Sequence, residues 1–138
     1  SLRRKYRAQL HRSGLSDPNI MALVATEAAY RYGLPWLKEL RTQLASNLEQ
    51  VEAFFAQQLP GVILMSTQAT YMVWFNLQSY GVMAKIAERT LLEHGKVALN
   101  PGYIFGAAGD DWMRINFACP PTTLSEGLQR IKRGLDAL

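Results

Sequence analysis

The sequence has few of the residues that build disulfides, zinc sites or histidine-dependent active sites. Its 138 residues include one cysteine, Cys119, and two histidines, His11 and His94. A single cysteine excludes an internal disulfide framework and a multi-cysteine zinc site. Neither histidine has a second candidate ligand near it in the sequence, so we interpret both as surface residues. We therefore predict that the chain holds no metal.

Long apolar runs are also missing. No stretch approaches the ~20 residues that cross a bilayer, and no basic segment followed by an apolar one resembles a signal peptide. We therefore expect a cytoplasmic protein without a membrane partner. Apolar residues still make up 49% of the chain, which excludes a disordered protein and suffices for the core of one domain. The sequence starts at Ser1 rather than at a methionine, so we expect a piece of a longer protein.

The excess positive charge is confined to one end of the chain. The net charge is +4, and the first twelve residues contain five basic and no acidic side chains, whereas the rest of the chain carries 10 basic and 11 acidic groups. We interpret the basic segment as the solvated face of a helix, with an anionic partner as the alternative, and we expect no nucleic-acid partner. The five basic residues are Arg3, Arg4, Lys5, Arg7 and Arg12.

The first 59 residues predict three helices, of which residues 1–13 form the first. The pair Asp17-Pro18 is typical of a helix start, and Gly33 is typical of a helix end. Between residues 34 and 59, apolar residues recur at steps of three and four, which predicts one long helix. Its apolar stripe consists of Leu37, Leu40, Leu44, Leu48, Val51 and Phe55.

Beyond residue 61 the sequence period becomes that of β-strands. Met113, Ile115 and Phe117 alternate with polar or aromatic residues, as expected for a strand with one buried face. This part of the chain predicts an α+β fold, a small, mostly antiparallel sheet of three or four strands that packs against helices and follows a long linker helix. The predicted elements are strands 62–65 and 70–77, a helix 82–94, strands 97–99 and 112–118, and a last helix that starts at the capping box Thr123–Glu126.

Two candidate reactive groups and one loop have plain structural interpretations. Asp110-Asp111 ends a glycine-rich loop, and a metal site would need more oxygen ligands, so we predict a turn. Cys119 has no histidine placed to activate it, so we interpret it as a small buried residue. The loop lacks the Lys-Ser/Thr of a phosphate-binding loop. Either it needs unusual backbone angles, or its backbone approaches a ligand closely. Its glycines are Gly102, Gly106 and Gly109.

Arg114 is the most informative single residue. It lies in the middle of a predicted strand, with hydrophobic neighbours on both sides. A charged side chain is poorly placed there unless its face is solvated or it meets an anion. A planar guanidinium can bind a carboxylate through two parallel hydrogen bonds. The sequence therefore leaves two hypotheses open, a structural salt bridge and a site for a substrate carboxylate.

Two segments point to a family. They are residues 97–106, VALNPGYIFG, and residues 112–120, WMRINFACP, with Gly109 between them. Together they closely resemble the C-terminal end of class I/II aminotransferase-like enzymes that use pyridoxal phosphate, and above all the cystathionine β-lyase (C–S lyase) branch. The resemblance covers nearly the whole chain. It extends to Ala28-Ala29-Tyr30, Gly33, Trp36-Leu37, Asn47, residues 69–74 and Thr123–Glu126.

The resemblance implies a parent enzyme with a large cofactor domain followed by a small C-terminal domain. Residues 1–138 would be that small domain, including linker helices within residues 1–59. The resemblance also implies that Arg114 binds the α-carboxylate of an amino-acid substrate, that the parent uses pyridoxal 5'-phosphate, and that the parent is a homodimer.

The lysine that binds the cofactor is expected elsewhere. In the family it lies in a serine-x-x-lysine motif of the large domain, and no lysine here has that context. We therefore expect the large domain to be absent, the chain to hold no cofactor-binding residue, and the chain alone to be inactive. The sequence departs from the family at Gln68-Ala69, where a glycine is expected, and at Lys96, where a plain turn is common. The lysines are Lys5, Lys38, Lys85, Lys96 and Lys132.

Three hypotheses of function follow from the sequence. The parent is a C–S lyase that splits cystathionine-like substrates by β-elimination, or it is an aminotransferase, or the chain is a stand-alone binding or assembly domain without catalytic activity. A detached domain should also expose the face that met the large domain, and it should therefore self-associate. Candidates for that face are Trp74, Tyr71 and Trp112.

Overall fold

The structure, a computed structural model, describes residues 1–14 and 18–138. It contains two compact units, residues 1–41 and residues 42–138. The boundary falls inside one long helix, α3 (Leu34–Gln58). No helix in the described ranges is long and apolar enough to cross a membrane.

The first unit consists of α1 (Leu2–Arg12), α2 (Ile20–Tyr32) and the start of α3. Neither α1 nor α2 buries a residue within the described chain. The predicted start of α2 is wrong, because Pro18 precedes the helix and Asn19 caps it by accepting a hydrogen bond from Met21 N at 2.8 Å. Asp17 lies outside the described residues. Gly33 ends α2 as predicted.

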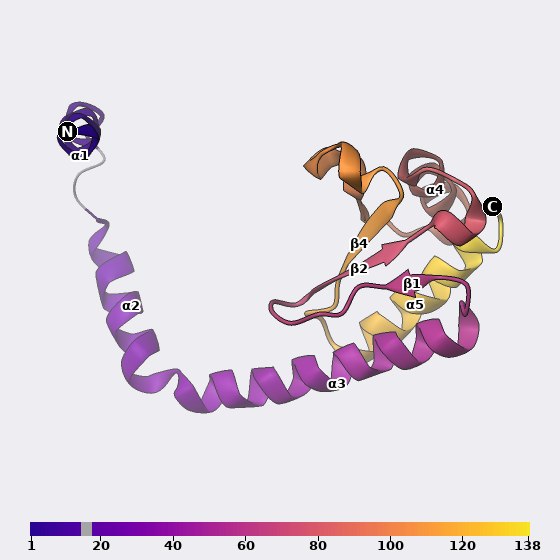
Figure 1. The fold of residues 1–138 in the computed structure, drawn as a ribbon. Coiled ribbons are helices and arrows are strands. Elements are labelled where there is room, and N and C mark those ends of the chain that lie inside the picture. The colour runs from indigo at the N-terminus through magenta and orange to yellow at the C-terminus, as the bar shows by residue number, and fades with distance from the viewer. Residues whose placement is uncertain (15–17) are drawn as a thin grey trace. The chain divides into compact units, whose positions relative to one another are not determined.

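The second unit contains a four-stranded sheet with strand order β1-β2-β4-β3 and antiparallel pairing throughout. Figure 1 shows β1, β2 and β4 of this sheet. The predicted fold class is thereby confirmed. The strands are β1 (Ile63–Leu64), β2 (Met72–Asn76), β3 (Asn100–Pro101) and β4 (Trp112–Asn116).

The predicted strand 97–99 is wrong by three residues, because the preceding helix ends in an unusual way. α4 (Ala84–Thr90) continues into a π-helical turn, η2 (Leu91–Gly95), and Lys96 adopts a left-handed backbone with φ of 55°. The backbone N–H of Val97 then bonds to Leu91 O at 3.2 Å. Val97 therefore completes the helix end, and pairing with β4 starts only at β3.

The last helix, α5 (Pro121–Leu135), begins two residues before the predicted capping box. A proline suits the first turn because its fixed φ is helical and its missing N–H needs no partner there. Thr123 is consequently already helical, and Glu126 pairs with Arg130 rather than with the helix start. The prediction of a capping box is wrong, although the helix itself is confirmed.

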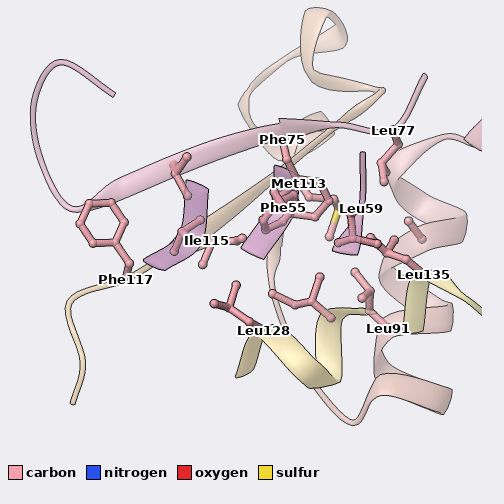
Figure 2. Close-up of a cluster of buried hydrophobic side chains, with 14 of the residues drawn as sticks. Phe55, Leu59, Phe75, Leu77, Leu91, Met113, Ile115, Phe117, Leu128 and Leu135 are labelled. Atoms are coloured by element: carbon pink, nitrogen blue, oxygen red, sulfur yellow. The ribbon is translucent and has the colours of Figure 1, made fainter. Parts of the chain in front are cut away.

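The core lies between the sheet and the helices of the second unit. Figure 2 shows side chains from α3, β2, β4 and α5 meeting in one cluster, with Phe55, Phe75 and Met113 at its centre. The predicted alternation in β4 is confirmed, since its buried face continues into Phe117. The stripe of α3 is buried only at its C-terminal end, whereas Leu37, in the first unit, is 43% exposed. The predicted face of α5 is buried throughout, at Leu124, Leu128, Ile131 and Leu135.

Candidate functional site

Arg114 lies on the face of the sheet opposite the core. Its neighbours in β4, Met113 and Ile115, are 0% and 4% exposed and point into the core. Arg114 pairs with Trp74 on β2 and with Asn100 on β3. Directly opposed residues of antiparallel strands share a face, so these three side chains form a row across the outer face of the sheet.

The guanidinium of Arg114 is held by neutral groups. Its Nη2 donates a hydrogen bond to Asn100 Oδ1 at 3.2 Å. Its central carbon lies 4.5 Å from the ring centroid of Phe105 and 5.7 Å from that of Trp74, within the ~6 Å reach of a cation–π contact. The two rings meet edge to face, with centroids 5.3 Å apart.

No acidic group compensates the charge of Arg114 in the described part of the chain. The ion pairs there join residues one turn apart on the surface of helices, and none includes Arg114. Its Nε is buried and has no acceptor among the described residues. An unsatisfied buried donor costs about 1–3 kcal/mol. The structural salt bridge considered above is therefore not formed within the described chain.

The glycine-rich loop brings Phe105 to the arginine. It contains two 3-10 turns, η3 (Gly102–Phe105) and η4 (Ala107–Gly109). A Cβ on Gly109 would lie 2.2 Å from the carbonyl oxygen of Gly102, so the two backbone segments touch. Gly106 has a φ of 127°, which disfavours other residues. The glycines thus allow both an unusual backbone angle, at Gly106, and a close backbone contact, between Gly102 and Gly109. That contact lies within the loop and does not involve a ligand.

A hydrogen bond anchors the same loop to α4. Tyr103 donates from its hydroxyl to Glu88 Oε2 at 2.7 Å. This bond needs the phenolic proton, so it raises the pKa of Tyr103. The loop is therefore closed at its base by backbone contact and fixed to a helix along its length.

The outer face of the sheet is recessed next to the arginine. Arg114 and Asn100 line a cavity of about 280 Å³ at the β3 edge of the sheet, and its other walls include the buried Ile115 and core-facing residues of α5 (Leu124, Leu128 and Ile131). A second recess of about 260 Å³ is lined by Trp74, Phe105, Met65 and Trp112. Arg114 is half-buried. The cavity that it lines lies between the sheet and α5, whereas the recess on the outer face is lined by its contact partners Trp74 and Phe105.

The other candidate groups have structural surroundings. The carbonyl oxygens of Asp110 and Asp111 accept hydrogen bonds from Ala84 N and Leu77 N at 2.6 and 2.7 Å. Burial raises the pKa of Cys119, which disfavours the reactive thiolate. The described residues contain no group of three potential metal ligands. Both histidines, His11 and His94, are exposed.

The lysines of the described chain lie apart from Arg114. No lysine is among the contacts of Arg114; Lys85 and Lys96 are exposed, and Lys132 pairs with Asp136. An active-site lysine that forms a Schiff base is typically desolvated. None of the described lysines is buried near Arg114, and the guanidinium of Arg114 has the donor geometry that can bind a carboxylate.

Sequence reasoning found Arg114 but not the residues that hold it. Asn100 could have been found only with β3 placed correctly beside β4. Phe105 contacts Arg114 only because of the path of the loop, and a loop path produces no periodic pattern in the sequence. Of the residues predicted to form an exposed apolar face, Tyr71 is exposed, but Trp74 and Trp112 are half-buried. Large exposed apolar residues occur in both units, and those of the first unit include Ile20, Met21, Tyr30, Tyr32, Leu34 and Trp36.

Known proteins share this sequence and fold. No protein-family model matches the chain. Cystathionine β-lyase PatB of Bacillus subtilis (strain 168) is 41% identical over 133 residues, which are 96% of this chain and 34% of that protein. The chain matches the C-terminal region of the cystathionine β-lyase and C–S lyase family. The resemblance predicted from the sequence is thereby confirmed.

Two solved structures extend this match to the fold. The PLP-bound C–S lyase of Staphylococcus hominis has a TM-score of 0.81 at 26% identity, over 93% of this chain and 34% of that one. A PLP-bound protein from Clostridium difficile 630, assigned as an aminotransferase, has a TM-score of 0.89 at 34% identity, over 93% of this chain and 33% of that one. The chain thus spans about a third of the length of each of these relatives.

Proposed function

We propose that residues 1–138 are the C-terminal small domain of a pyridoxal-phosphate-dependent C–S lyase, with linker helices within residues 1–59. In this proposal, Arg114 binds the α-carboxylate of a cystathionine-like amino acid. One observation carries the proposal: the guanidinium of Arg114 is held in place on the outer face of the sheet while its charge has no acidic partner among the described residues.

The donors of Arg114 suit a carboxylate. A guanidinium carries five N–H donors in a planar fork, and the described residues accept from Nη2 alone. The remaining donors can form a bidentate pair with a carboxylate, and such charge-assisted bonds are about twice as strong as neutral ones. Because a lysine offers a point charge instead of a fork, it would bind the same group with less directional control.

Holding the carboxylate contributes to the reaction through orientation. Bound pyridoxal phosphate supplies an electron sink for cleavage of bonds at the substrate Cα. Arg114 fixes one of the four Cα substituents, which limits the rotation of the others. Correct positioning of reacting groups can be worth up to ~7–11 kcal/mol in total, and Arg114 supplies part of it.

The reaction itself can be tested on the full-length protein. A lyase should convert cystathionine to pyruvate, ammonia and a thiol, whereas an aminotransferase should exchange the amino group with a 2-oxo acid and release no thiol. We expect thiol and pyruvate in equal amounts. Amino-group exchange without thiol release would instead establish the aminotransferase alternative, in which Arg114 would bind the same carboxylate.

The chain without the remaining two thirds should be inactive. When the 138-residue chain is mixed with pyridoxal phosphate and an amino acid, we expect no absorbance change beyond that of a variant with all five lysines replaced by arginine. A saturable change that depends on one lysine would show that the chain holds its own cofactor site, contrary to the proposal.

A further inference from the structure

We propose that Phe105 and Asn100 are positioning residues that hold the guanidinium of Arg114 ready for a carboxylate without neutralising its charge. This inference rests on the function proposed above and adds how the arginine is kept in place. It concerns residues that act through Arg114 and are not themselves required to touch the substrate.

In the described chain, the restraint on Arg114 comes from neutral groups and not from an acidic partner. An acidic partner would immobilise the guanidinium equally well, but it would compete with an incoming carboxylate for the same N–H groups. The contacts of Arg114 in the described chain are an amide oxygen and two aromatic rings. They fix the side chain and leave its positive charge available.

The two positioning residues act in different directions. A cation–π contact holds the charge over the ring of Phe105, at 4.5 Å from its centroid, and uses none of the N–H donors. The hydrogen bond to Asn100 Oδ1 acts within the guanidinium plane, because N–H groups donate in that plane, and it fixes rotation about the side-chain axis. Together they leave the buried, unpartnered Nε with few alternative orientations.

Phe105 is itself held in place from outside the core. Its ring contacts Trp74 edge to face, and its loop is fixed to α4 through the Tyr103–Glu88 hydrogen bond. Phe105 remains 54% exposed, so it contributes little to the hydrophobic core. A large ring at an exposed loop position is explained by the contact that it makes with Arg114.

The test compares Phe105→Leu with Phe54→Leu in the full-length enzyme. Phe54 is a half-buried ring of α3 that contacts Phe55 and is absent from the contacts of Arg114. We expect Phe105→Leu to raise KM for the amino acid about three- to tenfold with a smaller change in kcat. Phe105→Tyr keeps an aromatic ring and should retain the KM of the wild type. We expect Asn100→Ala to raise KM by about threefold, and Phe54→Leu to leave KM unchanged.

A spectroscopic measurement on the 138-residue chain reports the positioning directly. The Nε–H proton of Arg114, identified by its loss in Arg114→Lys, should carry a ring-current shift that moves in Phe105→Leu but not in Phe54→Leu. Thermal melting confirms folding, and Phe105→Met replaces Phe105→Leu if the latter does not fold. An unmoved resonance, or a KM no higher than that of Phe54→Leu, overturns the inference.

The variant Arg114→Gln distinguishes a failure of the proposed function from a failure of the positioning by Phe105. If Arg114→Gln leaves KM unchanged in the full-length enzyme, Arg114 does not bind the carboxylate and the proposed role fails, whatever the NMR result. If Arg114→Gln raises KM while Phe105→Leu behaves like Phe54→Leu, Arg114 keeps its role and only the positioning by Phe105 is wrong.

Discussion

Neighbouring residues of β4 lie on opposite faces of the sheet and have different surroundings. Met113 and Ile115 are buried among apolar side chains and contribute to folding. Arg114, between them, is held on the other face by Asn100 and Phe105 with its charge uncompensated in the described chain. One strand thus carries a face buried in the core and a face on which we propose that the substrate binds, and the side-chain alternation of a β-strand separates them.

The largest expected effect is on the core face. Ile115→Ala should lower the free energy of unfolding of the chain by about 2–5 kcal/mol, because it removes buried methyl groups and leaves a cavity. Arg114→Gln, on the adjacent residue, should change it by less than about 1 kcal/mol, since no ion pair is lost. Urea unfolding of both variants checks the comparison, and equal losses would show that the two faces are not separable.

The next effect concerns Asn47, a buried polar side chain that links α3 to the residues after β4. Asn47 is 1% exposed and donates from Nδ2 to the carbonyl oxygens of Phe117 and Cys119 at 2.8 and 2.9 Å. Asn47→Ala removes both of these hydrogen bonds, although Phe117 O still accepts one from Cys119 N. We therefore expect a loss of about 1–3 kcal/mol in unfolding free energy. Ser46→Ala, on the exposed side of the same helix, is the control and should stay within about 0.5 kcal/mol.

The burial of residues that follow a periodic sequence pattern could be predicted, whereas contacts that depend on the path of a loop could not. The buried positions of β4 and α5 follow from sequence spacing alone. The position of β3 depends on the π-helical turn at Leu91–Gly95, which the pattern of the preceding helix does not show. The contact between Phe105 and Arg114 depends on a loop closed by Gly102 and Gly109, and sequence spacing cannot supply that geometry.

A substitution in the backbone of the glycine-rich loop tests whether the loop positions Arg114. Gly109→Ala places a Cβ against the carbonyl oxygen of Gly102, so the loop must open and Phe105 must move. We expect a loss of about 1–2 kcal/mol in stability and a KM for the amino acid at least as high as that of Phe105→Leu. Gly127→Ala in α5 meets no atom within 4 Å and should raise stability by up to about 1 kcal/mol. A Gly109→Ala enzyme with unchanged KM would contradict the link between loop and arginine.

The smallest expected effect is at the loop anchor. Tyr103→Phe removes the hydrogen bond to Glu88 and should raise KM by less than about threefold, because the bond is exposed. The bond raises the pKa of Tyr103, so its stabilising contribution is present below about pH 10, the ordinary tyrosine pKa, and is lost as the pH rises through the raised pKa. Kinetics of wild type and variant should therefore converge at high pH, and a difference that persists there would exclude the anchor as its cause.

The most direct measurement compares a substrate with its carboxamide analogue in the full-length enzyme, for wild type and Arg114→Gln. If Arg114 binds the α-carboxylate, wild type should prefer the carboxylate by about 100-fold or more in kcat/KM, because charge-assisted bonds are lost with the amide. Arg114→Gln should reduce that preference to within about tenfold. An undiminished preference in the variant would show that the carboxylate is bound by another group, and the central claim would be wrong.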